Sequence, residues 1–399
     1  FVAHPMEGFD SETDGSPGEL SFRRYIRYAR GGFGLIWAEA TAVLHEGRSN
    51  PCQLYLNREN VDTFARLVET ARETGHKEYG REPVIILQLT HSGRYSKPGS
   101  APGPMIAHHS KVLDPKHNLP TDYPLLTDEY LDRLQDTFVE AAGLAARAGF
   151  DGVDIKSCHR YLVSELLASH TREGKYGGSY ENRTRFIRET LARIKETVPD
   201  IVITTRMNVY DAIEYPWGWG VDKDDYRVPD LEEPTALVKD LSSLGIAILN
   251  VTSGNPYFNP HVNRPYDSPV PGVQPYPEHP LYGVCRFISL TRQIQQAVPR
   301  IPVVASGYSW LRQFIPQIAA GVINTRGASL LGLGRMAFAY PDAPRDIMVN
   351  GKLEPSKCCI TCSKCTQIMR YGGHTGCVVR DSELYDYEYR KACSRNSDK

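Results

Sequence analysis

The segment Asp151–Leu162 carries side chains that could take part in chemistry. Its sequence is DGVDIKSCHRYL, and it begins as a strand, with Val153 and Ile155 in an apolar run. Polar residues follow the strand: Lys156, Cys158, His159 and Tyr161. A cation, an imidazole and a phenol at one strand end could polarise a carbonyl group and deliver a proton. A polar loop between a strand and a helix has a similar composition, so the segment by itself favours a plain loop.

Cysteine is concentrated at the end of the chain. Six of the nine cysteines follow residue 357, which does not indicate a disulfide framework and favours a reduced, intracellular protein with a local metal or cluster site. The segment KCCITCSKCTQIMRYGGHTGC has the spacing C-x2-C-x2-C-x11-C, formed by Cys359, Cys362, Cys365 and Cys377. Three closely spaced thiolates and a distant fourth are typical of a cubane iron–sulfur cluster, whereas zinc sites more often use two separated pairs. We therefore predict a 4Fe–4S cluster, with structural zinc as the alternative.

The other thiols and one histidine receive simpler interpretations. Cys358 could replace its neighbour as a ligand, and His374 is expected to be a loop histidine. We assign Cys158, Cys52 and Cys285 to packing, since a small buried cysteine is common.

Composition limits the function classes. The chain has 399 residues, 41% hydrophobic residues and a net charge of −1, so no global charge predicts binding to nucleic acid or a membrane surface. No apolar run is long enough to span a bilayer and no signal peptide is visible. We expect a cytoplasmic protein. Phe1 lies inside a predicted strand and is not Met, so we expect that a few N-terminal residues are missing, and a removed targeting segment stays open.

One pattern recurs along the chain: an amphipathic segment, a glycine and a continuous apolar strand. It occurs at 28–40, 144–156, 241–252 and 318–334. The glycines suit helix ends, and continuous apolar strands indicate a parallel sheet buried on both faces. Eight candidate strands follow from this pattern: Phe1–Met6, Leu35–Ala40, Val84–Leu89, Val153–Lys156, Val202–Met207, Ala247–Val251, Pro302–Ala305 and Ser329–Leu333. The sequence therefore predicts an α/β fold, a (β/α)8 TIM barrel with a C-terminal Cys-rich iron–sulfur segment. A doubly wound sheet is the alternative, but no GxGxxG lies between a strand and a helix.

Helix periodicity and composition complete the predicted organisation. Residues 128–148 and 183–197 carry apolar stripes with helical spacing. After Pro341 the chain becomes rich in cysteine, then in tyrosine and charge. We therefore expect a barrel at 1–344 and an appendage at 345–399.

Three long loops should form a lid or pocket wall. They span 90–126, 208–230 and 253–283, and the last two are rich in Pro and aromatic residues. Their aromatic side chains suggest a large apolar ligand such as a steroid or an acyl-CoA: Tyr210, Tyr215, Trp217, Trp219, Tyr257 and Phe258.

Active sites of such barrels lie at the carboxyl ends of the strands. The predicted strand-end residues outside the first segment are Pro5, Met6, Glu7, Ala40, Gln88, Arg206, Ser306, Gly307, Gly334 and Arg335. The last four suit a phosphate, because loops after the seventh and eighth strands offer backbone N–H groups and a guanidinium. The amide of Gln88 suits the edge of a heteroaromatic ring. Arg206 either faces a developing anion or forms an interior ion pair with Glu39 or Glu7.

These residues and motifs resemble the Old Yellow Enzyme family of FMN-dependent ene-reductases. The resemblance rests on Pro5-Met6, QLTHSGR at 88–94, the run HRYLVSELLASHTREGKYGGSYENRTRF at 159–186, the Arg206 strand, and the ASGY and GLGR motifs. YGGSYENRTRF is highly specific to the family, and the cysteine segment points to the branch that includes 2,4-dienoyl-CoA reductase, 2-enoate reductase and trimethylamine dehydrogenase.

The resemblance implies an FMN site. Gln88 and Arg206 match the residues that hold the pyrimidine edge of the flavin, and Gly307, Gly334 and Arg335 match the phosphate site. Pro5, Met6, Ala40 and Ser306 fall at strand ends that surround this cofactor. Glu7 matches a position beside the flavin that tunes its potential, where relatives often carry Thr, Cys or His.

The resemblance also implies the substrate-binding wall. Relatives usually carry His-x-x-His or His-x-x-Asn, which bind the substrate's carbonyl oxygen, and here the pair is Lys156 and His159. Tyr161 matches the tyrosine that protonates the substrate α-carbon. Arg160 and Tyr308 stand where relatives usually have Gly. A Lys at 156 should favour a more anionic oxygen, such as a carboxylate or an enolate.

The implied activity is an ene-reductase that takes electrons from NADH or NADPH, or from a partner subunit through the cluster. In relatives the cluster serves later nucleotide-binding domains, which this chain lacks, so truncation, separate subunits or a structural cluster remain open. The alternatives are an amine dehydrogenase, which Lys156 disfavours by charge repulsion, and a non-catalytic barrel subunit. We expect a small-molecule enone or enoate substrate and a homo-oligomer, and an electron-transfer partner subunit is one of the alternatives left open.

Overall fold

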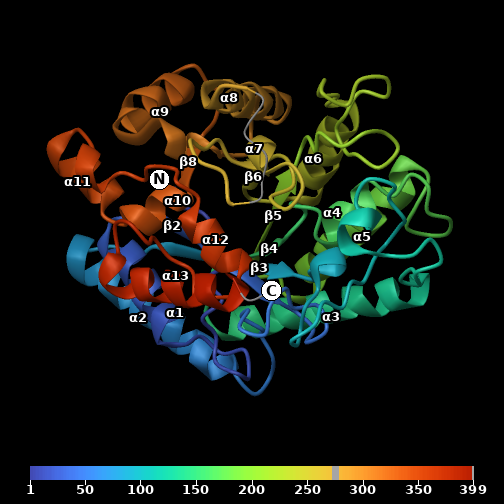
Figure 1. Cartoon of the computed structure of the whole chain (residues 1–399), viewed down its shortest axis with the longest axis horizontal. Helices are drawn as coiled ribbons and strands as arrows, with labels where there is room; N and C mark the ends of the chain where they lie inside the picture. Colours follow the sequence, from blue (N-terminus) through green and yellow to red (C-terminus); the bar gives the residue numbers. More distant parts are fainter. Residues whose placement is uncertain (272–277, 398–399) are drawn as a thin grey trace.

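The computed structural model is a closed barrel of eight parallel strands (Figure 1). It describes residues 1–271 and 278–397, so residues 272–277 of the third predicted loop lie outside the described part. The strands are β1 (Val2–Ala3), β2 (Leu35–Ala42), β3 (Val84–Thr90), β4 (Gly152–Ile155), β5 (Val202–Asn208), β6 (Leu249–Thr252), β7 (Val303–Ala305) and β8 (Leu330–Leu333). The barrel closes where Val2 pairs with Gly332 of β8 and with Leu35 of β2. The predicted TIM barrel and all eight predicted strands are confirmed.

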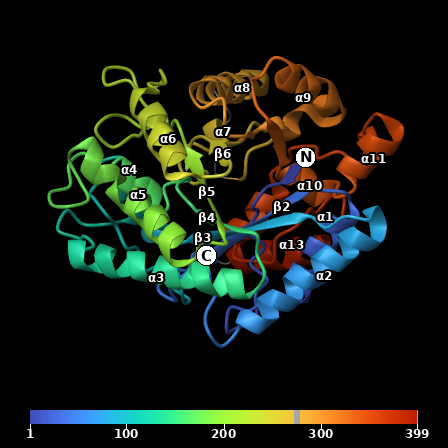
Figure 2. The ribbon, with the colours of Figure 1, turned by 180° about the vertical axis from the view of Figure 1, so that it is seen from behind.

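The helices surround the strands, as Figures 1 and 2 show from opposite sides. The α-helices are α1 (Glu19–Arg30), α2 (Val61–Tyr79), α3 (Asp128–Arg147), α4 (Leu162–Leu167), α5 (Tyr180–Thr197), α6 (Glu232–Leu244), α7 (Pro260–Asn263), α8 (Pro280–Ala297), α9 (Ile315–Asn324), α10 (Arg335–Ala339), α11 (Ala343–Asn350), α12 (Lys364–Arg370) and α13 (Ser382–Ser397). Short 3-10 helices are η1 (Gly93–Tyr95), η2 (Asp114–His117), η3 (Tyr308–Phe314) and η4 (Pro355–Lys357). No helix among the described residues combines the length and apolar character that a membrane crossing requires.

Local capping explains where the two predicted helices begin. The side chain of Thr127 accepts a hydrogen bond from the backbone N–H of Tyr130, which fixes the start of α3 as expected. The side chain of Ser179 likewise accepts from the N–H of Asn182, so α5 begins at Tyr180 and not at residue 183. The apolar stripe marks the buried face of a helix, whereas the cap marks its end.

The hydrophobic core has two parts. A small cluster fills part of the barrel interior and includes Val2, Trp37, Ile86, Ile248 and Val304. A much larger cluster lies between the strands and the outer helices. Because the strands are buried on both sides, the polar side chains that can reach a ligand collect where the strands end, while interior ones such as Asp154 are buried within the barrel.

The C-terminal segment packs back onto the barrel. In both views α13 lies beside α1, and Asp381 forms ion pairs with Arg23 and Arg27 of α1 (Figures 1 and 2). The backbone N–H of Thr375 donates to the carbonyl of Gly8 at 2.6 Å, just after β1. The predicted boundary after residue 344 falls inside α11, and the division into two domains stays a prediction.

Candidate active site

A cavity with about 1000 Å³ of empty space lies at the carboxyl ends of the strands. Apart from the appendage, its lining comes from seven regions: the ends of β1, β3, β4, β5, β7 and β8, and the segment 256–264. The appendage closes one wall with Cys365, Thr366, Met369 and Thr375. Its lining combines apolar side chains with a few polar and charged groups, as ligand-binding sites for organic molecules do.

Nearly all of the predicted non-metal site residues line this cavity. They are Pro5, Met6, Glu7, Gln88, Lys156, His159, Tyr161, Arg206, Ser306, Gly307, Gly334 and Arg335. Ala40 is buried and does not line the cavity, and its carbonyl accepts a hydrogen bond from the amide of Gln53 at 3.0 Å. Of the six aromatic loop residues, Tyr257 alone lines the cavity, and Trp219 instead packs in the core.

A buried carboxylate underlies one end of the cavity. Asp154 accepts hydrogen bonds from Trp37 Nε1 at 2.7 Å, from Gln88 Nε2 at 2.5 Å and from the backbone N–H of Arg206 at 2.7 Å. Burial raises the pKa of Asp154 to about 6, and the hydrogen bond from Gln88 opposes the shift. Asp154 therefore fixes the side chain of Gln88 and the backbone of Arg206 relative to each other inside the barrel.

Arg206 does not form the predicted interior ion pair. Within the described residues Glu39 pairs with Arg24, and Glu7 pairs with Lys156. The Nε of Arg206 is buried without a hydrogen-bond partner in that part of the chain, and burial lowers the pKa of its guanidinium. A buried cation that lines a cavity and lacks an ion pair fits an anionic or electron-rich ligand.

Glu7, Lys156 and Tyr161 form one hydrogen-bonded group. Lys156 Nζ donates to Glu7 Oε1 at 3.0 Å, and the Tyr161 hydroxyl donates to the two Glu7 oxygens at 3.2 and 3.3 Å. Lys156 Nζ also lies 3.6 Å from the ring centroid of Tyr161. The two departures from the family pattern, at positions 7 and 156, thus compensate each other electrostatically.

Tyr161 holds its proton firmly. Burial is the largest cause that raises the pKa of its phenol well above the usual value, and the nearby carboxylate of Glu7 adds to it. Its hydroxyl lies 3.1 Å from that of Tyr257, whose ring stacks on Tyr95 with centroids 4.2 Å apart. At neutral pH the group is a protonated, positioned phenol.

His159 offers an unpartnered imidazole nitrogen. Its Nε2 is buried and has no hydrogen-bond partner among the described residues. Burial, followed by the charges of Arg206 and Lys156, lowers the pKa of His159 well below its usual value. The neutral ring can therefore donate one hydrogen bond to a ligand oxygen.

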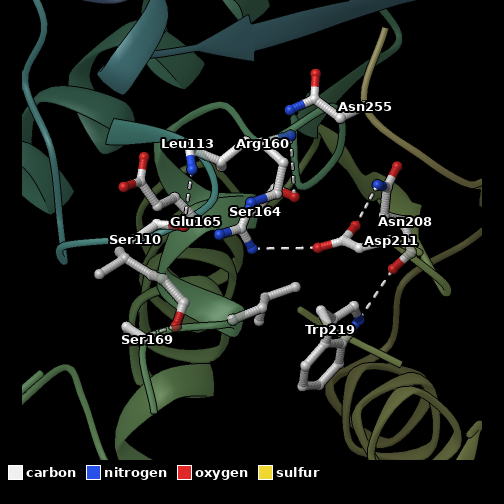
Figure 3. Close-up of polar contacts among 12 residues, drawn as sticks. Ser110, Leu113, Arg160, Ser164, Glu165, Ser169, Asn208, Asp211, Trp219 and Asn255 are labelled. Atoms are coloured by element: carbon white, nitrogen blue, oxygen red, sulfur yellow. Dashed lines mark hydrogen bonds and ion pairs between the residues drawn. The ribbon is translucent and has the colours of Figure 1, made fainter. Parts of the chain in front are cut away.

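Arg160 points away from the cavity into a buried polar network (Figure 3). Its guanidinium lies 3.1 Å from Asp211 and 3.2 Å from His108 Nε2, and Asn208 donates to the same Asp211 at 2.6 Å. Its φ of +60° explains why Gly suits this position in relatives. Arg160 therefore does not line the cavity, and its buried hydrogen bonds hold the loop that carries His159 and Tyr161.

The opposite end of the cavity is built for an anion. Gly307 has φ +93°, and a Cβ there would lie 2.4 Å from the ring of Phe287. Arg335 donates to the carbonyl of Pro265 at 2.6 Å, and its Nη1 is buried without a partner in the described chain. Tyr308, the other departure from the family pattern, packs in the core.

Arg264 is a candidate binding residue that sequence reasoning missed. It lines the same end as Arg335, and burial lowers its pKa to about 9, assisted by repulsion from Arg335 and Arg370. Three features at this end fit the phosphate of FMN: the turn at Gly307, the unpartnered Nη1 of Arg335, and arginines whose charges repel one another. The available signal was its place in the loop 253–283, which was predicted to form the pocket wall.

Further lining residues carried no motif in the sequence. They are His4, Pro256, Asn263, Ser309, Phe338, Thr366, Met369 and Thr375.

The four predicted cluster cysteines share one region. Burial raises the pKa of Cys359 to about 12 and of Cys377 to about 11, and in both cases a charge on Cys365 adds to the shift. The backbone N–H of Thr361 donates to Cys359 Sγ at 3.4 Å, and another backbone N–H donates to Cys377 Sγ. Burial also raises the pKa of Cys365, and a charge on Cys362 adds to the shift.

In residues 1–271 and 278–397, no group of three or more His, Cys, Asp or Glu side chains is placed to hold a metal ion. Both the cluster and the zinc alternative therefore stay predictions.

The structure also places the other cysteines and the histidine that the sequence singled out. Cys358 donates to the carbonyl of Glu354 at 3.4 Å, and His374 Nδ1 lies 2.7 Å from the carbonyl oxygen of Phe9, as expected of a loop histidine. The assignment of Cys285 to packing is wrong, because this thiol is exposed on α8.

Comparison with known proteins identifies the lineage of this barrel. Residues 1–347 match the NADH:flavin oxidoreductase / NADH oxidase family. The chain belongs to this family. The match confirms the resemblance at the level of the family and agrees with the expectation of an FMN-dependent oxidoreductase, while the iron–sulfur branch stays a prediction.

One curated relative of this family member matches most of the chain. NADH oxidase of Thermoanaerobacter brockii is 29% identical over 374 residues, which cover 91% of this chain and 50% of the relative. The chain thus spans about half the length of that protein.

Two solved structures share the fold over nearly the whole chain, appendage included. A 2-naphthoyl-CoA reductase in complex with 2-naphthoyl-CoA has a TM-score of 0.73 and 18% identity, over 97% of this chain and 55% of the other. Histamine dehydrogenase from Rhizobium sp. 4-9 has a TM-score of 0.69 and 21% identity, over 96% of this chain and 50% of the other. At these identities the likeness concerns the fold.

Proposed function

We propose that the protein is an FMN-dependent ene-reductase that acts on α,β-unsaturated carbonyl compounds. When bound, reduced FMN supplies a hydride to the β-carbon of such a substrate. The observation that carries the proposal is the convergence of Lys156, the orphaned Nε2 of His159 and the Tyr161 hydroxyl on one wall of a cavity with an anion cradle at its other end. Family membership supports the flavin and a nicotinamide nucleotide as electron donor.

The geometry supports the following roles in holding the cofactor. Gln88 and Arg206, fixed by Asp154, would face the pyrimidine edge, and Arg206 would stabilise negative charge there. The phosphate would bind at Gly307, Gly334 and the guanidinium of Arg335, with Arg264 as a second cation. Pro5, Met6 and Ser306 would complete the walls.

The substrate wall would hold an oxygen and deliver a proton. His159 and Lys156 donate hydrogen bonds to the carbonyl oxygen, which stabilises the negative charge that develops there. Tyr161 then gives its hydroxyl proton to the α-carbon as a general acid. For this step its hydrogen bond to Glu7 must be exchanged for contact with the substrate.

The substrate class remains open among enoates, enoyl-CoA thioesters and steroid enones. The cavity volume accommodates each reacting group, and the 2-naphthoyl-CoA reductase structure supports a thioester by likeness of fold. Either NADH or NADPH could be the donor.

Replacing Tyr161 with Phe tests the proposal. We expect reoxidation of the reduced flavin by an enone such as 2-cyclohexenone to slow by about 100-fold or more, since a positioned general acid contributes roughly 10²–10⁴. Flavin content and reduction by NADH should stay unchanged. Tyr79→Phe is the matched control, because its hydroxyl bonds to the Arg30 carbonyl far from the cavity. Unchanged reoxidation in Tyr161→Phe would remove this residue from the mechanism.

The amine dehydrogenase alternative keeps one supporting observation. Because Glu7 balances the charge of Lys156, a cationic amine is repelled less than the sequence suggested. An assay with tertiary amines and histamine, using an artificial electron acceptor, separates the two activities. A colourless protein after anaerobic reconstitution with FMN would instead favour the non-catalytic barrel.

We also propose that Cys359, Cys362, Cys365 and Cys377 hold a 4Fe–4S cluster. The C-x2-C-x2-C-x11-C spacing and the backbone N–H···S hydrogen bonds to Cys359 and Cys377 support it. Anaerobically purified protein should contain about four irons and four sulfides per chain, and Cys362→Ser should lose most of both. Cys285→Ser is the control at an exposed thiol and should lose none. One tightly bound zinc in place of iron would contradict the cluster.

A further inference from the structure

Glu7 places a carboxylate directly beside the cation of the substrate wall. Lys156 Nζ and Glu7 Oε1 are 3.0 Å apart, and their side chains are only 4% and 9% exposed. Both line the cavity that also contains Tyr161. An oxygen that approaches the ammonium group therefore also approaches the carboxylate.

The other charged groups around the cavity lie outside the Glu7–Lys156 pair, although Arg206 and Arg264 also act on His159. His159 is neutral, since its pKa is lowered well below the usual value by burial and nearby cations. Arg206 lies beside Asp154, and Arg264 and Arg335 lie at the end of the cavity that contains Gly307 and Gly334. On the substrate wall itself the ion pair carries no net charge.

We infer that Glu7 is a specificity-determining residue that makes this site select uncharged unsaturated carbonyls, such as ketones, esters and thioesters, over free carboxylates. A neutral carbonyl oxygen accepts hydrogen bonds from Lys156 and His159 without approaching Glu7 as a charge. A free carboxylate places a second negative charge next to Glu7 in a partly desolvated pocket, where like charges repel strongly. This inference rests on the proposed function and reverses the expectation that Lys156 by itself favours an anionic oxygen.

The test compares one acid with its own methyl ester, so that only the charge differs. The FMN-loaded wild type and Glu7→Gln would be assayed for kcat/KM with 2-hexenoate and methyl 2-hexenoate. We expect the wild type to prefer the ester at least tenfold. In Glu7→Gln the ester-to-acid ratio should fall at least tenfold, mainly because the acid gains.

A binding arm separates failure of this inference from failure of the proposed reaction. Hexanoate and methyl hexanoate, which cannot be reduced, would be titrated against the oxidised enzyme while the flavin absorbance is followed. The acid should bind Glu7→Gln at least tenfold more tightly than the wild type, and the ester should change less than threefold. If neither unsaturated compound is reduced but this shift is seen, the reaction proposal fails and the role of Glu7 stands.

Three variants guard against indirect effects. Glu7→Asp keeps the charge and should retain the ester preference within threefold. Glu7→Gln combined with Lys156→Met removes both charges and should lose the gain in acid binding. Glu12→Gln, an exposed carboxylate on the same segment, should behave as wild type. An ester-to-acid ratio that is unchanged in a flavin-loaded Glu7→Gln, or a wild type that prefers the acid, would overturn the inference.

Discussion

A buried arginine without a carboxylate partner is costly unless a ligand supplies the missing charge. Arg264 illustrates this: burial and the repulsion of Arg335 and Arg370 lower its pKa to about 9. Uncompensated buried cations destabilise a fold, whereas a bound phosphate turns the same charge into binding energy. We therefore expect Arg264 to destabilise the empty protein and to stabilise the ligand-bound protein.

Arg264→Leu should therefore have opposite effects on the apo and FMN-bound protein. We expect the apo protein to gain a few degrees in Tm, because a repelled charge is removed. We also expect the Kd for FMN to rise at least tenfold, in keeping with the strength of charge-assisted phosphate contacts. Differential scanning fluorimetry and quenching of FMN fluorescence measure the two effects. Arg58→Leu, an exposed cation on the surface, should change neither. A tighter or unchanged Kd for FMN in Arg264→Leu would refute this assignment.

At the scale of elements, the turn between β7 and η3 shapes the anion cradle. Gly307 adopts φ +93°, and the ring of Phe287 from α8 fills the space where a Cβ would lie. The turn can therefore form only with a residue that has no side chain and tolerates left-handed geometry.

The same change, glycine to alanine, should have opposite effects on the free energy of unfolding at two positions. Gly307→Ala should destabilise the apo protein by about 1–3 kcal/mol, because strained backbone and steric overlap combine, and should also weaken FMN binding. Gly321→Ala in α9 meets no heavy atom within 4 Å and should stabilise the helix by roughly 0.5–1 kcal/mol. Urea unfolding of both apo proteins measures the difference. Equal stabilities would show that the β7 turn relaxes around a Cβ.

At the scale of the whole molecule, one carboxylate links the appendage to the barrel. Asp381, directly before α13, accepts from Arg23 at 2.7 and 2.8 Å and also pairs with Arg27, both on α1. Burial alone would raise the pKa of Asp381, but the two guanidinium groups outweigh it and the pKa is lowered.

The lowered pKa fixes the pH dependence of Asp381→Asn. A carboxyl group with a depressed native pKa stabilises the fold above its unfolded pKa, near 4, and this contribution is lost as the pH falls below it. We expect the variant to lose about 1 kcal/mol at pH 7, since the arginines are partly exposed and screened. The difference from the wild type should shrink below pH 4. Thermal melts at pH 7.0 and 3.5 measure it, and limited proteolysis should cleave the variant faster after residue 345. A difference that grows on acidification would contradict the assignment.

The sequence predicts the barrel and the strand-end side chains because both depend on local patterns. Continuous apolar strands and glycine helix ends fix the order of elements, and closure then brings Gln88, Arg206 and Tyr161 to one cavity. The Glu7–Lys156 pair could not be predicted in this way, since 149 positions separate the two residues and their contact depends on barrel geometry. Arg264 was missed for a related reason, because its role follows from the proximity of Arg335 and Arg370 and from no motif.

The appendage wall has a consequence for the order in which the protein is made. Strands β1 to β8 end at Leu333, whereas Cys365, Met369 and Thr375, which close the cavity, leave the ribosome after all eight strands. During synthesis the barrel can therefore form while one side of its mouth is still open. Until His374 and Thr375 dock against Phe9 and Gly8, the side of the cavity that the appendage closes stays open to a flavin. We therefore expect FMN to enter a barrel with an undocked appendage faster than the finished fold.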